Sequence, residues 1–580
     1  MTTEAAKNAT ASEKTPIIQF ADYSFHYRVQ SEPTLKNIDL TIYKGEKVLI
    51  VGPSGSGKST LGHCLNGLAP HFYPGEASGD AWINGKPLSG LDIFSLSEIV
   101  GTVLQDPDGQ FVGLTVAEDI AFKLENDGVE QAEMIRKVEE AARLVDMERH
   151  LASSPQELSG GQKQRTSLGG VLVSDASVLL FDEPLANLDP YTGKRAIELI
   201  DRIHKDSGKT VIIIEHRLED VLHRDVDRII VMRDGGIAGD YTPDELLCSE
   251  LLKLTGIREP LYVTALKYTG CGLTPEMRLS DLTELKLDDC KAPLQAWSDS
   301  LPETKPSEMA APILELRNIS FAYEAEKPIV QNISFQIQQG EMVSIVGKNG
   351  AGKSTLSKLI CGFYRPSGGS IHYKGADMAS DTIKERAERI GFVMQNPNHM
   401  ISKTLLFDEV ALGLKVRGID PEETERRVMD TLRVCGLHDY RSWPVSALSF
   451  GQKKRVTIAS ILVLQPEVII LDEPTAGQDF KHYNEMMEFL LELNRGGVTV
   501  VMITHDMHLM LEYADRTIVL ADGRLLADDE PSGVLTDEAV IRAANLKETS
   551  LYELGKRAGL SDPKALVRKF IAFDREARGI

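Results

Sequence analysis

Two short glycine-rich runs of this sequence contain the residues best suited to binding a nucleotide phosphate. Each has the pattern GxxxxGK[ST], with Lys58 and Lys353 as the lysines. The glycines let backbone N–H groups turn toward phosphate oxygens, the lysine reaches the terminal phosphates, and the next hydroxyl can bind Mg²⁺. The sequence therefore predicts two ATP-binding loops. Their residues are Gly52, Pro53, Ser54, Gly55, Ser56, Gly57, Lys58, Ser59 and Thr60 in the first loop, and Gly347, Lys348, Asn349, Gly350, Ala351, Gly352, Lys353, Ser354 and Thr355 in the second.

Two apolar runs that end in Asp-Glu supply the carboxylates that such loops need. Their sequences are VLLFDE and VIILDE. Asp182 and Asp472 suit the coordination shell of Mg²⁺, because this hard cation prefers oxygen ligands. The adjacent Glu183 and Glu473 would point differently and could polarise an attacking water.

The same motifs recur at nearly constant spacing. Lys58 and Lys353 are 295 residues apart, and Asp182 and Asp472 are 290 residues apart. Such self-similarity indicates a tandem duplication, so we expect one ATP-binding domain in each half of the chain.

The elements that position these residues are predicted by the flanking sequence. Apolar runs at 48–51 and 342–346 predict buried parallel strands before the loops, and a helix should begin near Ser59. Residues 241–311 carry 12 acidic and 7 basic residues and end in a Ser-, Pro- and Glu-rich stretch typical of a linker. The predicted division is an N-terminal tail at 1–16, a first domain at 17–252, a small appendage and linker at 253–312, a second domain at 313–545 and a C-terminal helical appendage at 546–580.

Composition narrows the class of protein further. The chain has 580 residues, 42% of them hydrophobic, which is ample for packed cores. It has 64 basic and 86 acidic residues and a net charge of −22, which argues against nucleic acid as its main partner. The six cysteines form no CxxC pair, so zinc ribbons and thioredoxin-like chemistry lose support. No run of apolar residues is long enough to predict a membrane-spanning helix.

With these motifs identified, both copies resemble the ATP-binding cassette (ABC) family. The resemblance implies an α/β fold with two P-loop NTPase (ABC ATPase) domains in tandem, each with a RecA-like core and a helical signature subdomain. It implies that Gln105 and Gln395 are Q-loop glutamines, which contact Mg²⁺ and respond to a transmembrane partner. The other residues that match family motifs are Ser159, Gly160, Gly161, Gln162, Ser449, Gly451 and Gln452 of the two signatures, Asp189 and Asp479 of the D-loops, His216 and His505 as switch histidines, and Tyr27 and Tyr323 as aromatics that stack on adenine.

The resemblance also implies how the two copies cooperate. In the family, two domains pack head to tail, and each ATP lies between the glycine-rich loop of one and the signature of the other. One site would then pair Lys58 with Ser449, and the other would pair Lys353 with Ser159. Phe450 stands where the family has the first glycine of the signature. Both copies retain the catalytic set, so we expect two hydrolysing sites. The implied catalytic residues are Glu183, His216, Glu473 and His505.

Segments beside the motifs resemble the ATPases of energy-coupling factor (ECF) importers, in the form that fuses both ATPases and is linked with cobalt or thiamine-precursor uptake. The segments are 106–112, 115–122, 215–220, 396–401 and 407–411. The resemblance implies a membrane T component and a substrate-binding S component as partners. It implies uptake of a vitamin, a vitamin precursor or a metal ion, and a peripheral location at the cytoplasmic face of the cell membrane. The apolar pairs at 111–112 and 400–401 would face the T component or pack on their own subdomain.

Two other functions stay open from sequence alone. One is a soluble tandem ABC protein that acts on ribosomes. Such proteins usually have a basic linker to reach RNA, whereas the linker here has a net charge of −5. The other is the tandem ATPase of a sugar importer. In that group the second copy commonly departs from the catalytic pattern, whereas Glu473 and His505 are present here.

Overall fold

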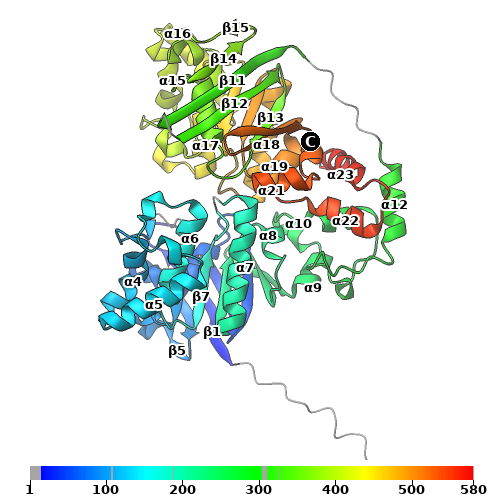
Figure 1. Ribbon diagram of the computed structural model, residues 1–580. Coiled ribbons are helices and arrows are strands. Elements are labelled where there is room, and N and C mark those ends of the chain that lie inside the picture. Colours follow the sequence, from blue (N-terminus) through cyan, green and yellow to red (C-terminus); the bar gives the residue numbers. More distant parts are fainter. Residues whose placement is uncertain (1–14, 106–108, 187, 303–309, 325–326, 579–580) are drawn as a thin grey trace, which may run out of the picture. The chain divides into compact units, whose positions relative to one another are not determined.

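The computed structural model describes residues 15–105, 109–186, 188–302, 310–324 and 327–578 (Figure 1). They divide into two compact units. One unit holds most of the chain up to residue 286. The other holds most of the chain from 287 onward, together with the short segments 189–191 and 264–271. Most of the predicted N-terminal tail, residues 1–14, lies outside the described residues. The domain boundaries given above stay predictions.

The first unit contains two sheets. An antiparallel sheet has the strand order β2-β1-β4-β5, and a six-stranded sheet has the order β10-β9-β3-β8-β7-β6. In the larger sheet only the edge strand β10 is antiparallel to its neighbour. The strands are β1 (Pro16–Tyr27), β2 (Leu35–Tyr43), β3 (Lys47–Val51), β4 (Gly75–Ile83), β5 (Lys86–Pro87), β6 (Val100–Val103), β7 (Val178–Asp182), β8 (Thr210–Ile214), β9 (Arg228–Arg233) and β10 (Gly236–Tyr241).

The second unit repeats this topology. Its antiparallel sheet has the order β12-β11-β14-β15, and its larger sheet has the order β16-β17-β18-β13-β19-β20, again with only the last strand antiparallel. The strands are β11 (Pro312–Glu324), β12 (Lys327–Gln338), β13 (Met342–Val346), β14 (Gly368–Tyr373), β15 (Ala376–Asp377), β16 (Ile390–Val393), β17 (Val468–Asp472), β18 (Thr499–Ile503), β19 (Arg516–Ala521) and β20 (Arg524–Asp529). The predicted α/β fold and the buried parallel strands at 48–51 and 342–346 are confirmed.

The central strands are apolar throughout because both faces of each larger sheet are covered. In the second unit, Ile470 and Val501 join a core against the antiparallel sheet, whereas Ile469 and Val500 join a core beneath the helices. Neighbouring residues of a strand point to opposite faces, so one continuous apolar run fills two cores. This packing fixes the strand ends at which the predicted catalytic residues lie.

Helices connect the strands in each unit. In the first unit they are α1 (Lys58–Asn66), α2 (Leu68–His71), α3 (Ile93–Ser97), α4 (Val116–Asn126), α5 (Gln131–Leu144), α6 (Gly160–Leu172), α7 (Pro190–Ser207), α8 (Leu218–Val221), α9 (Pro243–Cys248) and α10 (Leu251–Thr255). Helices α4, α5 and α6 pack together as a separate helical layer (Figure 1). The side chain of Thr115 and the side chain of Glu118 form a capping box that fixes the start of α4.

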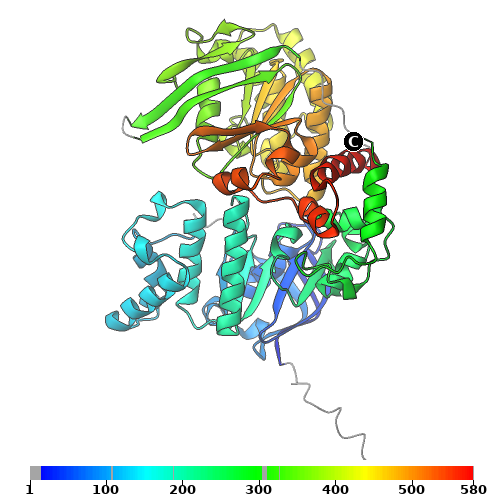
Figure 2. The same cartoon turned by 45° about the vertical axis from the view of Figure 1, so that its right-hand side comes forward.

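The second unit has matching helices and an additional helical cluster. The matching helices are α13 (Lys353–Ile360), α14 (Ile383–Arg386), α15 (Leu406–Val416), α16 (Pro421–Val434), α17 (Phe450–Leu462), α18 (Phe480–Arg495), α19 (Met507–Tyr513), α20 (Pro531–Val534) and α21 (Glu538–Ala544). In the additional cluster, α12 (Lys291–Ser300) packs against α22 (Ser550–Ala558) and α23 (Pro563–Ala577), as Figures 1 and 2 show.

Aromatic rings join this cluster to the end of α11 (Leu261–Tyr268). The ring of Tyr268 lies 5.1 Å from that of Phe573 and 6.2 Å from that of Trp297. Its hydroxyl donates to a carboxylate oxygen of Asp574 at 2.6 Å. The segment between the two copies and the C-terminal segment, which the sequence suggested as two appendages, therefore meet in one aromatic core.

Candidate nucleotide-binding sites

The two glycine-rich loops hold their lysines in the same way. The ammonium group of Lys58 donates to the carbonyl oxygens of Gly52 and Pro53, at 2.7 and 3.0 Å. The ammonium group of Lys353 donates to the two matching carbonyls at 2.6 and 3.1 Å. Each lysine begins a helix, α1 or α13, whose N-terminus carries partial positive charge. Both loops are therefore suited to bind phosphate.

One glycine in each loop is required by backbone conformation and by space. Gly57 and Gly352 cap the two helices with left-handed φ angles of 98° and 97°. A Cβ atom would lie 2.8 Å from a methyl carbon of Leu35 in the first case and 2.9 Å from the carbonyl oxygen of Ile329 in the second. A residue with a side chain would be strained and would push the loop away from its strand.

The carboxylates at the ends of β7 and β17 fit a Mg²⁺ ion. One carboxylate oxygen of Asp182 is buried and has no hydrogen-bond partner among the described residues. In the second unit, the hydroxyl of Ser354 donates to Asp472 at 3.1 Å. A hydroxyl next to a carboxylate and a buried carboxylate oxygen without a donor are both suitable ligands for this cation.

The two predicted catalytic glutamates follow these strands directly, on a strained turn. Glu183 and Glu473 both have a left-handed φ of 49°. Such a conformation costs about 1–3 kcal/mol in a residue other than glycine. The backbone N–H groups of both glutamates are held by strand carbonyls, of Ile214 and Ile503, at 2.9 Å. Because of this turn, the side chain of each glutamate points in a different direction from that of the aspartate before it.

In the first unit, the glutamate contacts the Q-loop more closely than the histidine. The side-chain amide of Gln105 donates to Glu183. The Nδ1 atom of His216 lies 3.9 Å from Glu183 but 3.2 Å from Glu215. Glu215 is completely buried and accepts the backbone N–H groups of Leu185 and His216.

In the second unit, the histidine contacts the glutamate directly. The Nδ1 atom of His505 lies 2.6 Å from a carboxylate oxygen of Glu473. The hydroxyl of Thr504, which occupies the place of Glu215, donates to the other oxygen at 3.4 Å. The two predicted catalytic sets therefore have the same glutamate and histidine in different contacts.

The pKa values of the aspartates differ accordingly. The pKa of Asp182 is raised to about 6, chiefly by burial and also by the charges of Glu183 and Glu215, with the charge of Lys58 acting in the opposite direction. Burial also raises the pKa of Asp472, but there a hydrogen bond from Ser354 and the charges of Lys353 and Lys454 oppose the shift. The predicted Mg²⁺-binding position of the second unit thus has two nearby ammonium groups, Lys353 and Lys454, where that of the first unit has Lys58.

The signature residues form the N-terminal caps of α6 and α17. The side chain of Gln162 accepts the backbone N–H of Ser159, and Gln452 accepts that of Ser449, each at 2.9 Å. Phe450 leaves 43% of its side chain exposed. The S-x-x-Q spacing of the signature therefore has a local structural reason as well as the role implied by the family resemblance.

The predicted adenine aromatics lie beside the loop helices. The hydroxyl of Tyr27 donates to that of Thr60 at 3.2 Å, and the hydroxyls of Tyr323 and Thr355 are also 3.2 Å apart. Tyr323 is 53% exposed. The structure thus brings both tyrosines to the loop, where stacking on a base is possible.

The D-loop aspartates are both buried, with 4% and 5% of Asp189 and Asp479 exposed. Asp479 caps α18 by accepting the backbone N–H of His482 at 2.9 Å. Asn187, within the first D-loop, and residues 106–108, after the first Q-loop glutamine, lie outside the described residues.

Sequence reasoning assigned no role to two charged residues at these sites, Glu215 and Lys454. Both occupy positions at which the copies differ: Glu215 matches Thr504, and Lys454 matches Gln164. The sequence does contain a sign of their importance. At both positions one copy has a charged residue and the other a neutral one, although the motifs beside them are shared.

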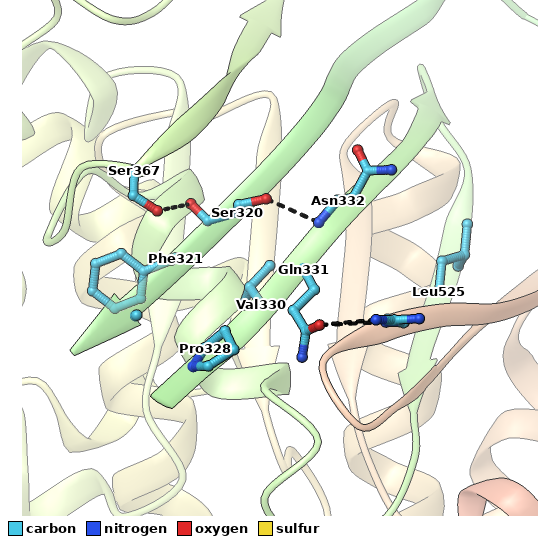
Figure 3. A pocket seen from close by; sticks show the side chains of 10 residues that line it. Ser320, Phe321, Pro328, Val330, Gln331, Asn332, Ser367 and Leu525 are labelled. Carbon is cyan, nitrogen blue, oxygen red and sulfur yellow. Dashed lines mark hydrogen bonds between the residues drawn. The ribbon is translucent and has the colours of Figure 1, made fainter. Parts of the chain in front are cut away.

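A groove of about 630 Å³ lies elsewhere in the second unit, on β11, β12 and β20 (Figure 3). Ser320 and Arg524 line it, and Arg524 donates to Gln331 at 3.1 Å. None of the residues lining this groove is one of the predicted site residues, and the ring of Phe321, which lines it, lies 5.0 Å from the ring of Tyr323.

Comparison with known families gives two matches. A family described as ABC transporter matches residues 35–186 and 330–476. A family described as ATP-binding cassette cobalt transporter matches residues 249–321.

Comparison with individual proteins extends the likeness to nearly the whole chain. An ABC transporter ATP-binding protein of Clostridium perfringens is 60% identical over 98% of this chain and 100% of its own length. One of Enterococcus faecalis is 58% identical over 97% of this chain and 100% of its own. Among solved structures, cbiO1 of Clostridium perfringens, described as part of the ABC transporter complex cbiONQ, is 34% identical over 40% of this chain and 94% of its own, with a TM-score of 0.38. The chain therefore belongs to the ABC transporter family, as an ATP-hydrolysing subunit with two ATPase domains in tandem.

Proposed function

We propose that this subunit energises an importer of the ECF type. The observation that carries the importer class is the match of residues 249–321 to a family described as ATP-binding cassette cobalt transporter. This segment lies outside the glycine-rich loops and the carboxylate motifs, so it adds information that those motifs do not contain. The cargo would be a vitamin, a vitamin precursor or a metal ion, bound by a separate S component.

Each unit contributes one hydrolysing site to this function. Lys58 and Lys353 bind the terminal phosphates, and Glu183 and Glu473 accept a proton from the attacking water. The aspartates and loop serines, with the Q-loop glutamines, would hold Mg²⁺, which neutralises phosphate charge. His216 and His505 orient the glutamates. The short His505–Glu473 contact and the strained turns at both glutamates support these roles.

Closure of the two domains around ATP would couple hydrolysis to transport. In this proposal each ATP lies between the glycine-rich loop of one domain and the signature of the other. The exposed signature caps Ser159 and Ser449, held by their own glutamines, leave backbone N–H groups of α6 and α17 available at the helix ends.

Exposed apolar side chains at matched positions support a protein partner in the membrane. Phe72 and Phe363, at matched positions, are 67% and 50% exposed. Helices α3 and α14 also match, and each exposes one apolar residue in its first turn: Phe94 is 79% and Ile383 is 50% exposed. Single exposed hydrophobic residues are ordinary, but their repetition in both copies favours a common docking surface. We propose that a T component binds there.

Further exposed apolar side chains lie near the first Q-loop. Val112 and Leu114 are 63% and 82% exposed. In the second unit, Met400 and Ile401 instead pack partly against the core of their own domain. The first copy therefore offers the larger apolar area beside its Q-loop. Among the described residues, no helix has the length and apolar character needed to cross a bilayer, so membrane attachment in this proposal depends on the partner.

Purification in mild detergent from native cells, followed by mass spectrometry, tests the proposal. Recovery of a polytopic membrane protein and a second, smaller integral protein is the expected result. The variants Phe94→Asp and Val112→Asp should lose these partners and still bind ATP. Val29→Asp, at a residue that is 94% exposed on another loop, is the matched control and should keep them. Recovery with ribosomes and without membrane proteins would contradict the ECF proposal.

A further inference from the structure

A lysine buried in the second ATPase domain connects three motifs of that domain. Lys454 lies on α17, five residues after Ser449 of the signature, and none of its surface is exposed. Its ammonium group donates to the backbone carbonyl of Gln395, in the Q-loop, at 2.8 Å and to that of Glu473 at 2.7 Å. One side chain thus holds the backbone of the signature helix, the Q-loop and the strand that ends in the catalytic glutamate.

The first site lacks this connection. Gln164 occupies the matching position, and its side-chain amide donates to the carbonyl of Pro184. Among the described residues, this is its one hydrogen bond. The fold therefore accommodates a neutral side chain at this position, and a cation is not required to complete α6 or the strand beside it.

Placing a lysine there is costly unless its charge is compensated. Burial of an ammonium group is strongly unfavourable without hydrogen bonds and nearby negative charge. Here two carbonyl acceptors and the carboxylates of Glu473 and Asp472 face it. The groups that compensate the buried charge, Gln395, Glu473 and Asp472, are the ones to which the proposed function gives roles in hydrolysis. Removing the ammonium group should therefore disturb these three residues rather than the hydrophobic core.

We propose that Lys454 is a positioning residue for ATP hydrolysis in the second site, fixing the Q-loop backbone relative to Glu473. The inference rests on the proposed role of Glu473 as the base. It implies that a displacement of the Q-loop backbone is transmitted to the backbone of the glutamate in the second copy through Lys454. In the first copy the Q-loop instead contacts the glutamate through the side-chain amide of Gln105.

The test uses the full chain carrying Glu183→Gln, so that hydrolysis reports the second site. Lys454→Met removes both hydrogen bonds and retains the length of the side chain. We expect kcat to fall about tenfold, as loss of hydrogen bonds from a charged donor predicts. The KM for ATP should change less than about twofold, since a positioning residue acts on the chemical step more than on binding. Lys453→Met, at the half-buried neighbouring lysine, is the control and should keep the kcat of the parent.

Hydrogen exchange gives a readout that does not depend on hydrolysis. Peptides covering residues 394–401 should exchange faster in Lys454→Met than in Lys453→Met. Unchanged exchange together with unchanged kcat would overturn the inference. A parallel rise in KM and fall in melting temperature, without selective loss of kcat, would assign the residue a structural role and would also overturn it. If Lys454→Met does not fold, Lys454→Gln, which copies the first site, replaces it with the same expected results.

A separate variant distinguishes failure of this inference from failure of the proposed function. Glu473→Gln in the same Glu183→Gln parent should abolish hydrolysis. If hydrolysis persists, the role of Glu473 is wrong, and the inference about Lys454 falls with it. If hydrolysis is lost but Lys454→Met keeps full kcat, only the role of Lys454 is wrong.

Discussion

The two ATP sites of this chain share their motifs and differ in the charge placed behind them. The first site has an additional buried carboxylate, Glu215, beside its histidine. The second has an uncharged Thr504 there and an additional buried ammonium group, Lys454, behind its glutamate. Matching motifs therefore do not imply matching electrostatics.

The difference extends to the contact between glutamate and histidine. His505 lies 2.6 Å from Glu473, whereas His216 lies 3.9 Å from Glu183 and is nearer to Glu215. In the first site the imidazole is shared between two carboxylates, and in the second it contacts one. We infer that the contact in the second site is better organised for proton transfer.

The largest effect should come from removing both proposed bases. Glu183→Gln combined with Glu473→Gln should lower the ATPase rate by at least about 100-fold, because general-base catalysis contributes about 10²–10⁴. Steady-state hydrolysis at saturating ATP is the measurement, and retained nucleotide binding is the control. Each single variant should leave measurable activity. If Glu183→Gln alone left the rate unchanged, the first site would not be hydrolysing ATP.

Replacing the histidines should lower kcat by a smaller factor than removing both bases, and by a different factor in each site. His505→Ala, measured with Glu183→Gln, should lower kcat about tenfold, because a direct charge-assisted contact is lost. His216→Ala, measured with Glu473→Gln, should lower it only about threefold, because that histidine contacts Glu183 weakly. Equal losses would show that these histidine–glutamate distances do not determine the role of the histidine.

The motifs that the two sites share could be predicted from sequence because each motif is short and local. A glycine-rich loop after a buried strand, and carboxylates at a strand end, are local features whose geometry follows from a few adjacent residues. The strands at 48–51 and 342–346 are found where the apolar runs placed them. The α/β fold and its duplication follow from the same local signals.

The parts that sequence reasoning missed depend on contacts between distant residues. The hydroxyl of Tyr268 reaches Asp574, 306 residues away, and no local periodicity indicates that pair. Lys454 follows a shared motif, and the motif itself assigns it no role. Only the three-dimensional packing shows that its ammonium group is buried against two backbone carbonyls.

The signature difference should have a modest effect on the first site. If the signature of the second domain binds the ATP held by Lys58, then Phe450→Gly should bring the helix end closer to that nucleotide. We expect a change in KM of about threefold for the site measured with Glu473→Gln, since a half-exposed ring is lost and no hydrogen bond is broken. The same substitution measured with Glu183→Gln should leave KM unchanged. An effect on the second site instead would contradict head-to-tail pairing.

The smallest effect tests the charge of Glu215 through pH. The pKa of Asp182 is raised to about 6 by burial and by the charges of Glu183 and Glu215, with Lys58 acting in the opposite direction. As pH falls through that value, Asp182 gains a proton and no longer suits Mg²⁺, so hydrolysis in the first site should decline. Glu215→Gln removes one of the charges that raise the pKa. The acidic limb of kcat/KM, measured between about pH 5 and pH 8 with Glu473→Gln, should therefore move to lower pH, by less than about one unit.

The second site, measured with Glu183→Gln, has no carboxylate at this position, and Thr504→Val should leave its acidic limb in place. A shift to higher pH in Glu215→Gln would mean that Glu215 stabilises the ionised aspartate through its hydrogen bonds, and the electrostatic contrast between the two sites would be wrong in sign.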